Sequence, residues 1–133
     1  MITVDSSVWI DYFRGDRTPQ TDALDALLDD SSHDLVLLDV VLMEVLRGFR
    51  HEHEFAMAHR LLSALPIVNS GGAEVARTAA TMYRQLRAIG VTVRSSIDLW
   101  VGAWCLREGC TLLHNDRDFS PMQAHHGLSS ATV

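Results

Sequence analysis

Short apolar runs alternate with longer amphipathic segments along this chain, and the alternation limits the folds that it can adopt. Runs typical of buried strands cover 1–4, 34–38, 67–68 and 111–113, and the tail 129–133 is a candidate fifth strand. Helical patterns lie between them, at about 8–13, 18–29, 54–65, 73–89 and 95–108, and Asp39 is expected to cap a further helix that carries Glu44. Strands separated by helices predict an α/β fold with a mostly parallel sheet, in which sites form at the carboxyl ends of the strands.

Four acidic residues end or interrupt apolar segments, where a carboxylate is least expected. Asp5 closes the first strand run and Asp116 follows the last one, so both lie at strand carboxyl ends. Glu44 lies among the apolar residues of 40–46, and Asp98 among those of 97–101. Burying an unpaired carboxylate costs several kcal/mol, so four of them in one small domain need a common explanation. A divalent cation provides it, and oxygen ligands select Mg²⁺ or Mn²⁺.

Each of these acids also has an ordinary structural explanation. Asp5 has the right position to cap a helix, Asp98 lies in a first helical turn, and Asp116 belongs to a charged turn. Glu44 is harder to explain, because its one helical counter-ion is Arg47 at i+3, and a surface pair of this kind contributes only about 0.3 kcal/mol. Taken together, the four positions favour a functional site.

Length and composition restrict the class of protein further. A chain of 133 residues with 47% apolar and 21% charged residues is expected to form one soluble globular domain over 1–133. Its longest apolar stretch is too short to span a bilayer and Asp5 interrupts any secretory signal, so we expect a cytoplasmic protein without membrane attachment. Cys105 and Cys110 lack the spacing of a metal or redox motif and are expected to pack in the core. The absence of lysine excludes sites built on one, such as a P-loop.

Arginine residues gather in one part of a chain whose net charge is −6. No acidic residue occurs from 75 to 97, where Arg77, Arg84, Arg87 and Arg94 all lie, and the first three have helical spacing. This stripe has two interpretations, a solvated helix face or a surface that follows the phosphates of a nucleic acid.

Four short motifs now identify a resemblance that covers nearly the whole chain. They are 2–10 (ITVDSSVWI), Glu44 with 45–48 (VLRG), 95–98 (SSID) and 115–119 (NDRDF). In this order and spacing they closely resemble the PIN-domain ribonucleases, and among these the VapC toxins of bacterial toxin–antitoxin pairs.

The resemblance implies a fold, an activity and a set of site residues. The fold is a three-layer α/β/α sandwich, and the activity is that of a Mg²⁺- or Mn²⁺-dependent endoribonuclease with an RNA substrate. The acidic site would comprise Asp5, Glu44, Asp98 and Asp116, with Ser6 beside it and Asp118 as an auxiliary carboxylate. The resemblance also implies a homodimer that a small antitoxin silences by entering the acidic groove. Arg47 and Arg94 are candidates to hold flanking phosphates.

One alternative function remains open from the sequence, and other interpretations are weaker. A non-catalytic module whose acidic groove receives a basic peptide has the same carboxylates. An aspartyl phosphatase is excluded, because it would need a second aspartate where Ser7 stands. A histidine metal site is not indicated, because the histidines at 51 and 53 do not form the H-E-x-x-H motif. The histidines at 125 and 126 are expected in a loop. The tryptophans at 9, 100 and 104 fit the core or a dimer face better than base stacking. Gly48 and Gly102, each four residues after a site acid, predict close backbone approach.

Overall fold

A four-stranded parallel sheet forms the centre of the molecule. The structure, a computed structural model, describes residues 1–133. The strands are β1 (Ile2–Val4), β2 (Leu35–Leu38), β3 (Ile67–Val68) and β4 (Thr111–Leu113). Their order across the sheet is β3-β2-β1-β4, and every neighbouring pair is parallel. The predicted α/β class with a parallel sheet is confirmed.

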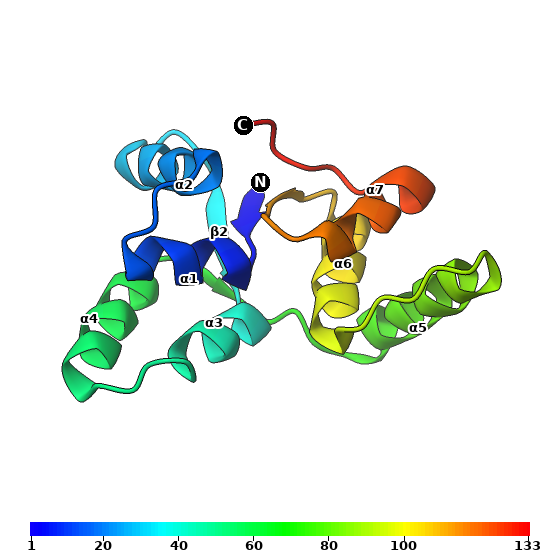
Figure 1. Ribbon diagram of the computed structural model, residues 1–133, viewed down its shortest axis with the longest axis horizontal. Helices are drawn as coiled ribbons and strands as arrows, with labels where there is room; N and C mark the ends of the chain where they lie inside the picture. Colours follow the sequence, from blue (N-terminus) through cyan, green and yellow to red (C-terminus); the bar gives the residue numbers. More distant parts are fainter.

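Helices cover both faces of this sheet. In chain order they are α1 (Ser6–Arg14), α2 (Pro19–Asp29), α3 (Asp39–Leu46), α4 (Glu52–Ser63), α5 (Ala73–Ala88), α6 (Ser96–Glu108), a 3₁₀ helix η1 (Arg117–Phe119) and α7 (Ser120–His126). Figure 1 shows α1 to α4 on one side of the sheet and α5 to α7 on the other. This is the three-layer α/β/α arrangement that the sequence resemblance implied. None of the helices is long and apolar enough to cross a membrane.

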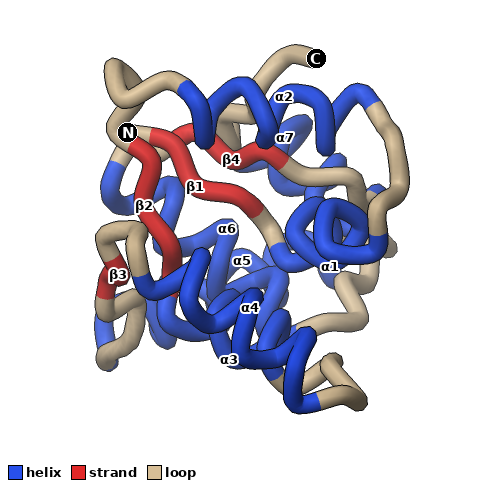
Figure 2. Tube along the Cα trace, turned by 90° about the vertical axis from the view of Figure 1, so that its left-hand side faces the viewer, coloured by secondary structure: helices blue, strands red, loops and turns tan.

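The strand order creates a crevice between the ends of β1 and β4. The chain leaves β1 toward β2 and β3, and it returns through α5 and α6 to β4 on the other side of β1. Val4 pairs with Leu113 at the carboxyl end of both strands, and the backbone N–H of Asp5 donates to Leu113 O at 2.9 Å. Figure 2 shows β1 lying between β2 and β4. Parallel α/β sheets place ligands at such a change of direction, so the fold itself favours a site here.

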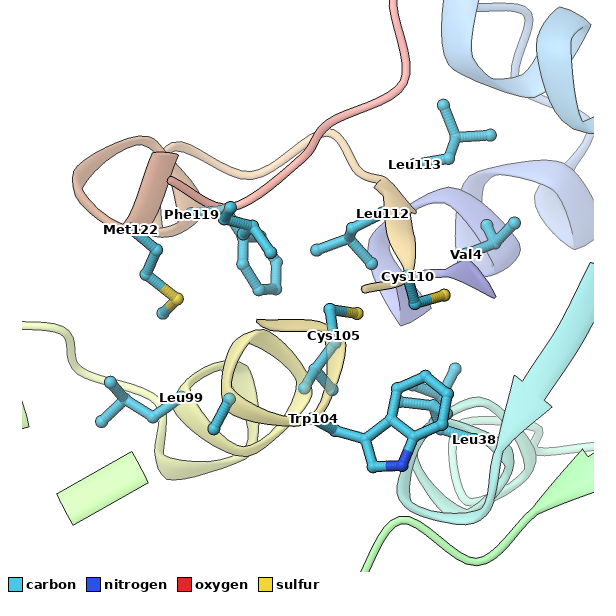
Figure 3. Packing of buried hydrophobic residues seen from close by; sticks show 14 of the residues in the cluster. Val4, Leu38, Leu99, Trp104, Cys105, Cys110, Leu112, Leu113, Phe119 and Met122 are labelled. Atoms are coloured by element: carbon cyan, nitrogen blue, oxygen red, sulfur yellow. The ribbon is translucent and has the colours of Figure 1, made fainter. Parts of the chain in front are cut away.

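One apolar core joins the sheet to both helical layers. All four residues of β2 are buried, and the largest fully buried side chains include Trp9 of α1 and Phe119 of η1. Figure 3 shows Phe119 and Met122 on the α6 side of the sheet, with Cys105 and Cys110 in the same cluster. Both cysteines are buried and free, so the predicted packing role is confirmed. The core therefore fixes η1 and α7 against α6.

Three sequence expectations about local structure were wrong. The tail does not form a strand, because beyond α7 it makes only one isolated bridge, between Ser130 and Leu112. His125 and His126 do not lie in a loop but end α7, where His126 Nε2 bonds Gln85 Oε1 at 2.9 Å. Asp39 does not cap α3, since Leu38 holds the N-cap position. The Asp39 carboxylate instead accepts bonds from a distant segment.

That segment leads from β3 into α5. Oδ1 of Asp39 accepts from the backbone N–H of Ser70 at 3.1 Å and from its hydroxyl at 2.6 Å. The carbonyl oxygen of Ser70 accepts from the Trp100 indole N–H at 2.8 Å. These bonds connect the start of α3 with the first turns of α6, the two helices that carry Glu44 and Asp98.

Candidate active site

Asp5 enters the crevice from the end of β1 because its backbone is still extended when α1 begins. It is the N-cap of α1, and its Oδ2 accepts from the Ser7 N–H at 3.1 Å. The residue is only 1% exposed, and its Oδ1 has no hydrogen-bond partner. Burial raises the pKa of Asp5, while bonds from Ser7 and Ser6 oppose the rise and the charge of Asp116 adds to it. The capping explanation therefore accounts for one oxygen of this carboxylate and leaves the other free.

Asp98 enters from the first turn of α6. Ser95 caps this helix, and its hydroxyl oxygen accepts from the Asp98 N–H at 3.2 Å. Asp98 is buried, and its pKa is raised to about 7, first by burial and then by the charges of Asp5, Asp116, Glu44 and Asp118. The charges of the other four acids thus all act on Asp98, which indicates that they lie near it.

Asp116 and Asp118 come from the loop that follows β4. Asp116 caps η1, and its Oδ1 accepts from the Asp118 N–H at 2.9 Å. One carboxylate oxygen each from Asp98, Asp116 and Asp118 lie within 4.8 Å of one another. The auxiliary carboxylate expected from the sequence thus belongs to the tightest part of the cluster.

Glu44 approaches from α3, on the opposite layer of the sandwich. The residue is half-buried, and its Oε1 is buried without a hydrogen-bond partner. Burial raises the pKa of Glu44, the Ser6 hydroxyl opposes the rise, Asp5 adds to it and Arg47 lowers it. Glu44 and Asp5 lie outside the tight group of three but share its electrostatic field. The structure therefore brings together all five predicted acids.

The donor set of this cluster suits a hard divalent cation. It offers carboxylate oxygens from four separate elements, and two of these oxygens, on Asp5 and Glu44, are buried without a partner. Buried acceptors normally find hydrogen bonds, so unpaired ones beside further carboxylates mark a place where positive charge is required. A set made of carboxylate oxygens suits a hard cation rather than a softer metal.

Two residues near the acids were missed in the sequence. The Ser7 hydroxyl accepts from the Asn115 N–H at 3.3 Å and so connects α1 to the loop after β4. His114 accepts from the Asp116 N–H at Nδ1, 3.3 Å away, and its Nε2 lies 2.7 Å from Gln123 Oε1 and 3.0 Å from Ser130 Oγ. The available signal for His114 was its position directly after the last strand.

The predicted arginine stripe divides into paired and unpaired residues. Arg77 forms an ion pair with Glu74 at 2.7 Å, and Arg87 donates to the Tyr83 hydroxyl at 3.2 Å. Arg84 and Arg94 instead line one groove of about 620 Å³ between α5 and the segment that leads to α6. Arg47 is exposed at the end of α3.

The tryptophans and glycines follow the sequence expectations in part. Trp9 and Trp104 are buried in the core, so neither presents a face for base stacking, whereas Trp100 is half-buried.

A Cβ at Gly102 would overlap Met122 Sδ of α7, which confirms close approach there. Gly48 lies beyond the end of α3 and shows only an ordinary contact, 3.5 Å to Val45 O, so the prediction was wrong at that position.

Comparison with known proteins agrees with this geometry. Residues 2–124 match the family model described as PIN domain. The chain is 31% identical over 132 residues to VapC ribonuclease Mb1587 of Mycobacterium bovis, covering 99% of this chain and 98% of the relative. It superposes on DNA-bound VapBC from Salmonella typhimurium with a TM-score of 0.77 at 17% identity, covering 98% of both chains. VapBC-5 from Mycobacterium tuberculosis, a member of the VapBC family of toxin-antitoxin systems, gives 0.68 at 19% identity, covering 99% of this chain and 98% of that one.

Proposed function

This chain belongs to the PIN domain family, and from this premise we propose that it is an endoribonuclease of the VapC type, the toxin of a toxin–antitoxin pair. The proposal extends over residues 1–133 as one catalytic domain. The observation that carries it is the convergence of five carboxylates from both helical layers on the crevice between β1 and β4. A surface of this charge would repel RNA unless a cation occupied it.

We assign the metal ligands from the geometry of the acids. Asp98, Asp116 and Asp118 would hold a Mg²⁺ or Mn²⁺ ion, with Asp5 and Glu44 completing the charge around it. Such an ion supplies positive charge to the scissile phosphate and promotes the attack of water. Asp98 must lose its proton before it acts as a ligand, and its raised pKa makes this the step most sensitive to pH near neutrality.

The remaining residues would orient the substrate. Ser6 lies between two of the acids, with its backbone N–H toward Asp5 and its hydroxyl toward Glu44, and would help to orient these carboxylates. Arg47 is the C-cap of α3, three residues after Glu44, and would hold a phosphate beside the cleaved one. The family supports RNA as substrate, and we propose a single-stranded or looped region, since splayed bases are the usual targets of sequence-specific RNA recognition.

We also propose two protein partners. The protein would form a homodimer and bind a small antitoxin whose terminal segment enters the acidic groove. Unneutralised carboxylates attract a cationic side chain, so an arginine of the antitoxin would occupy the space of the cation and prevent cleavage. Full cleavage activity at saturating antitoxin would contradict this mechanism of inhibition.

The nuclease proposal is tested by cleavage of structured RNA with Mn²⁺, with Mg²⁺ and with a chelator. We expect cleavage only with metal, and its loss in Asp98→Asn, since one ligand and one charge are removed. Asp29→Asn is the matched control, because this exposed aspartate ends α2 and is not part of the acidic cluster. Absence of metal-dependent cleavage at high enzyme excess, together with tight binding of a basic peptide, would favour the non-catalytic module instead.

A further inference from the structure

A groove beside α6 is the second feature of the molecule built for a ligand. We propose that it binds the RNA strand next to the cleaved phosphate, with Arg84 and Arg94 on the strand's phosphates and Tyr83 and Trp100 against a base. The inference rests on the proposed nuclease function and assigns its substrate a path over the protein.

The groove owes its shape to the sharp return of the chain after α5. Gly90, at a φ of +82°, reverses the direction, and the Val91 N–H donates to Leu86 O at 2.9 Å. Val93 then anchors the returning segment in the core. Figure 1 shows this segment running back along α5 to the start of α6. A surface closed by a helix on one side and an anchored segment on the other keeps its form before the ligand arrives.

The floor and one wall of the groove are apolar. Small side chains on α5, Ala79 and Ala80, leave room, while Tyr83, Leu99 and Trp100 supply apolar surface. The Trp100 ring is held in place because its N–H donates to Ser70 O, and Ser70 is itself buried. Aromatic rings held in this way stack on bases with little loss of entropy, and any base satisfies them.

The two arginines give the groove a positive charge that nothing in the protein neutralises. Arg84 and Arg94 are exposed, and neither takes part in an ion pair of the structure. The whole segment 75–97 lacks acidic residues. A ligand that combines anionic groups with flat apolar rings fits this surface, and a single-stranded nucleic acid has that chemistry.

The groove and the acidic site meet at the first turn of α6. Ser96, Leu99 and Trp100 line the groove, and Asp98 of the same turn points to the carboxylates on the other side of the helix. The two sites are therefore separated by about one helix diameter, roughly 10 Å. An RNA strand that passes the amino end of α6 would reach both the groove and the acidic site, and Arg94 lies just before that end of the helix.

A second copy of the chain fits the groove less well. A symmetric dimer through this face would bring Arg84 and Arg94 of each copy toward those of the other, with no acid between 75 and 97 to separate them. Like charges at a buried contact oppose association, whereas they favour a polyanion.

The test replaces the arginines and separates binding from cleavage. Arg84→Gln and Arg94→Gln should each raise KM for a single-stranded RNA by roughly tenfold at moderate salt, with kcat within about twofold. Binding of a non-cleavable 2′-O-methyl oligonucleotide, followed by fluorescence anisotropy, should lose about 0.7 from the slope of log K against log salt for each arginine removed. Arg77→Gln is the matched control, because the Arg77 charge is already paired with Glu74 on the same helix, and it should change neither quantity.

Each result discriminates between the two proposals. If wild type cleaves RNA and the groove variants match Arg77→Gln in KM and salt slope, the groove assignment is overturned and the nuclease function stands. If wild type cleaves no RNA but the salt slope falls as expected, the nuclease proposal fails while the groove assignment survives. A change in sedimentation from dimer to monomer in the double variant would show that a second copy occupies the groove.

Discussion

At the scale of single residues, local contacts hold three of the five acids of the site. Asp5 is fixed by the Ser7 N–H, Asp116 by the Asp118 N–H, and Asp98 by the capped first turn of α6. These bonds satisfy one oxygen or none of each carboxylate. The side chains are therefore held in place while their negative charge stays uncompensated. Such an arrangement suits a metal site, whereas a purely structural network would satisfy each carboxylate oxygen with hydrogen bonds.

His114 positions Asp116, and two substitutions separate its contacts. Asparagine retains an acceptor near the Nδ1 position and should still bond the Asp116 N–H, whereas glutamine reaches Gln123 and Ser130 but lacks that acceptor. A hydrogen bond of this kind contributes about 1 kcal/mol, so His114→Gln should lower kcat about fivefold with a normal melting temperature. His114→Asn should keep kcat and melt earlier, as measured by cleavage rate and thermal unfolding.

His125→Gln serves as the control for this prediction, because His125 is exposed at the end of α7 and makes no bond to the site loop. Equal kcat for the asparagine and glutamine variants would refute a positioning role for His114.

At the level of single residues, the sequence identified site residues where a charged side chain occurs within an apolar segment. Glu44 and Asp98 stood out because carboxylates are costly inside apolar runs, and both face the site. His114 did not stand out, because one histidine after a strand is ordinary and its contacts involve residues 9 and 16 positions away. Only the fold brings those partners to it.

At the scale of elements, the placement of the site loop depends on how closely α7 packs on α6. Gly102 has no side chain, and Met122 Sδ fills the space that a Cβ would take. Gly102→Ala should therefore cost about 1–3 kcal/mol of stability and shift α7 together with Asp116 and Asp118, which lowers cleavage. The measurements are thermal unfolding and the initial rate of RNA cleavage.

A second substitution checks that the effect comes from this contact. Adding Met122→Val to Gly102→Ala shortens the opposing side chain and should restore part of the stability. Gly48→Ala is the control, since its nearest contact, 3.5 Å to Val45 O, is ordinary and its backbone needs no positive φ. A stable and fully active Gly102→Ala variant would contradict this account of α6 and α7.

Elements with strong local signals were predictable from the sequence. Helix α6 carries its own caps, Ser95 at its start and Gly109 at its end, whereas α4 and α5 have no side-chain cap at their starts and were recognised by their apolar periodicity. By contrast, η1 and α7 are short, and what orders them is the burial of Phe119 and Met122 against other elements. Tertiary contacts of this kind leave no periodic pattern, so the sequence predicted neither helix.

At the scale of the whole molecule, the strand order determines where charge accumulates. Neighbouring positions for β1 and β4 bring Asp5 and Asp116 to one crevice, and the layers on either face add Glu44 and Asp98. Much of the negative charge of this chain, whose net charge is −6, thus lies in the crevice between β1 and β4, while the α5 side of the molecule carries unpaired arginines. This separation suits a protein that must attract a cation at one place and a phosphate chain beside it.

Burial of Asp98, together with repulsion from the other site acids, predicts an unusual dependence of stability on pH. The folded state raises the pKa of Asp98 from 3.8 to about 7, so between these values the folded protein keeps a proton that the unfolded chain has released. Stability of the metal-free protein should then fall as pH rises through this window, and the loss should be complete above it. Asp98→Asn removes the titrating group, so its stability should depend less on pH and, at pH 8, equal or exceed that of wild type.

Melting curves at pH 5.5 and pH 8, in chelator and in excess Mn²⁺, decide the matter for wild type, Asp98→Asn and the control Asp29→Asn. Mn²⁺ should raise the melting temperature of wild type more at pH 8 than at pH 5.5, because at pH 5.5 the metal must first displace the proton of Asp98. At either pH it should raise the melting temperature of wild type more than that of Asp98→Asn. The control should follow wild type throughout. If Asp98→Asn instead melts well below wild type in chelator at pH 8, Asp98 stabilises the fold through its hydrogen bonds, and repulsion at the acidic site is not what limits stability.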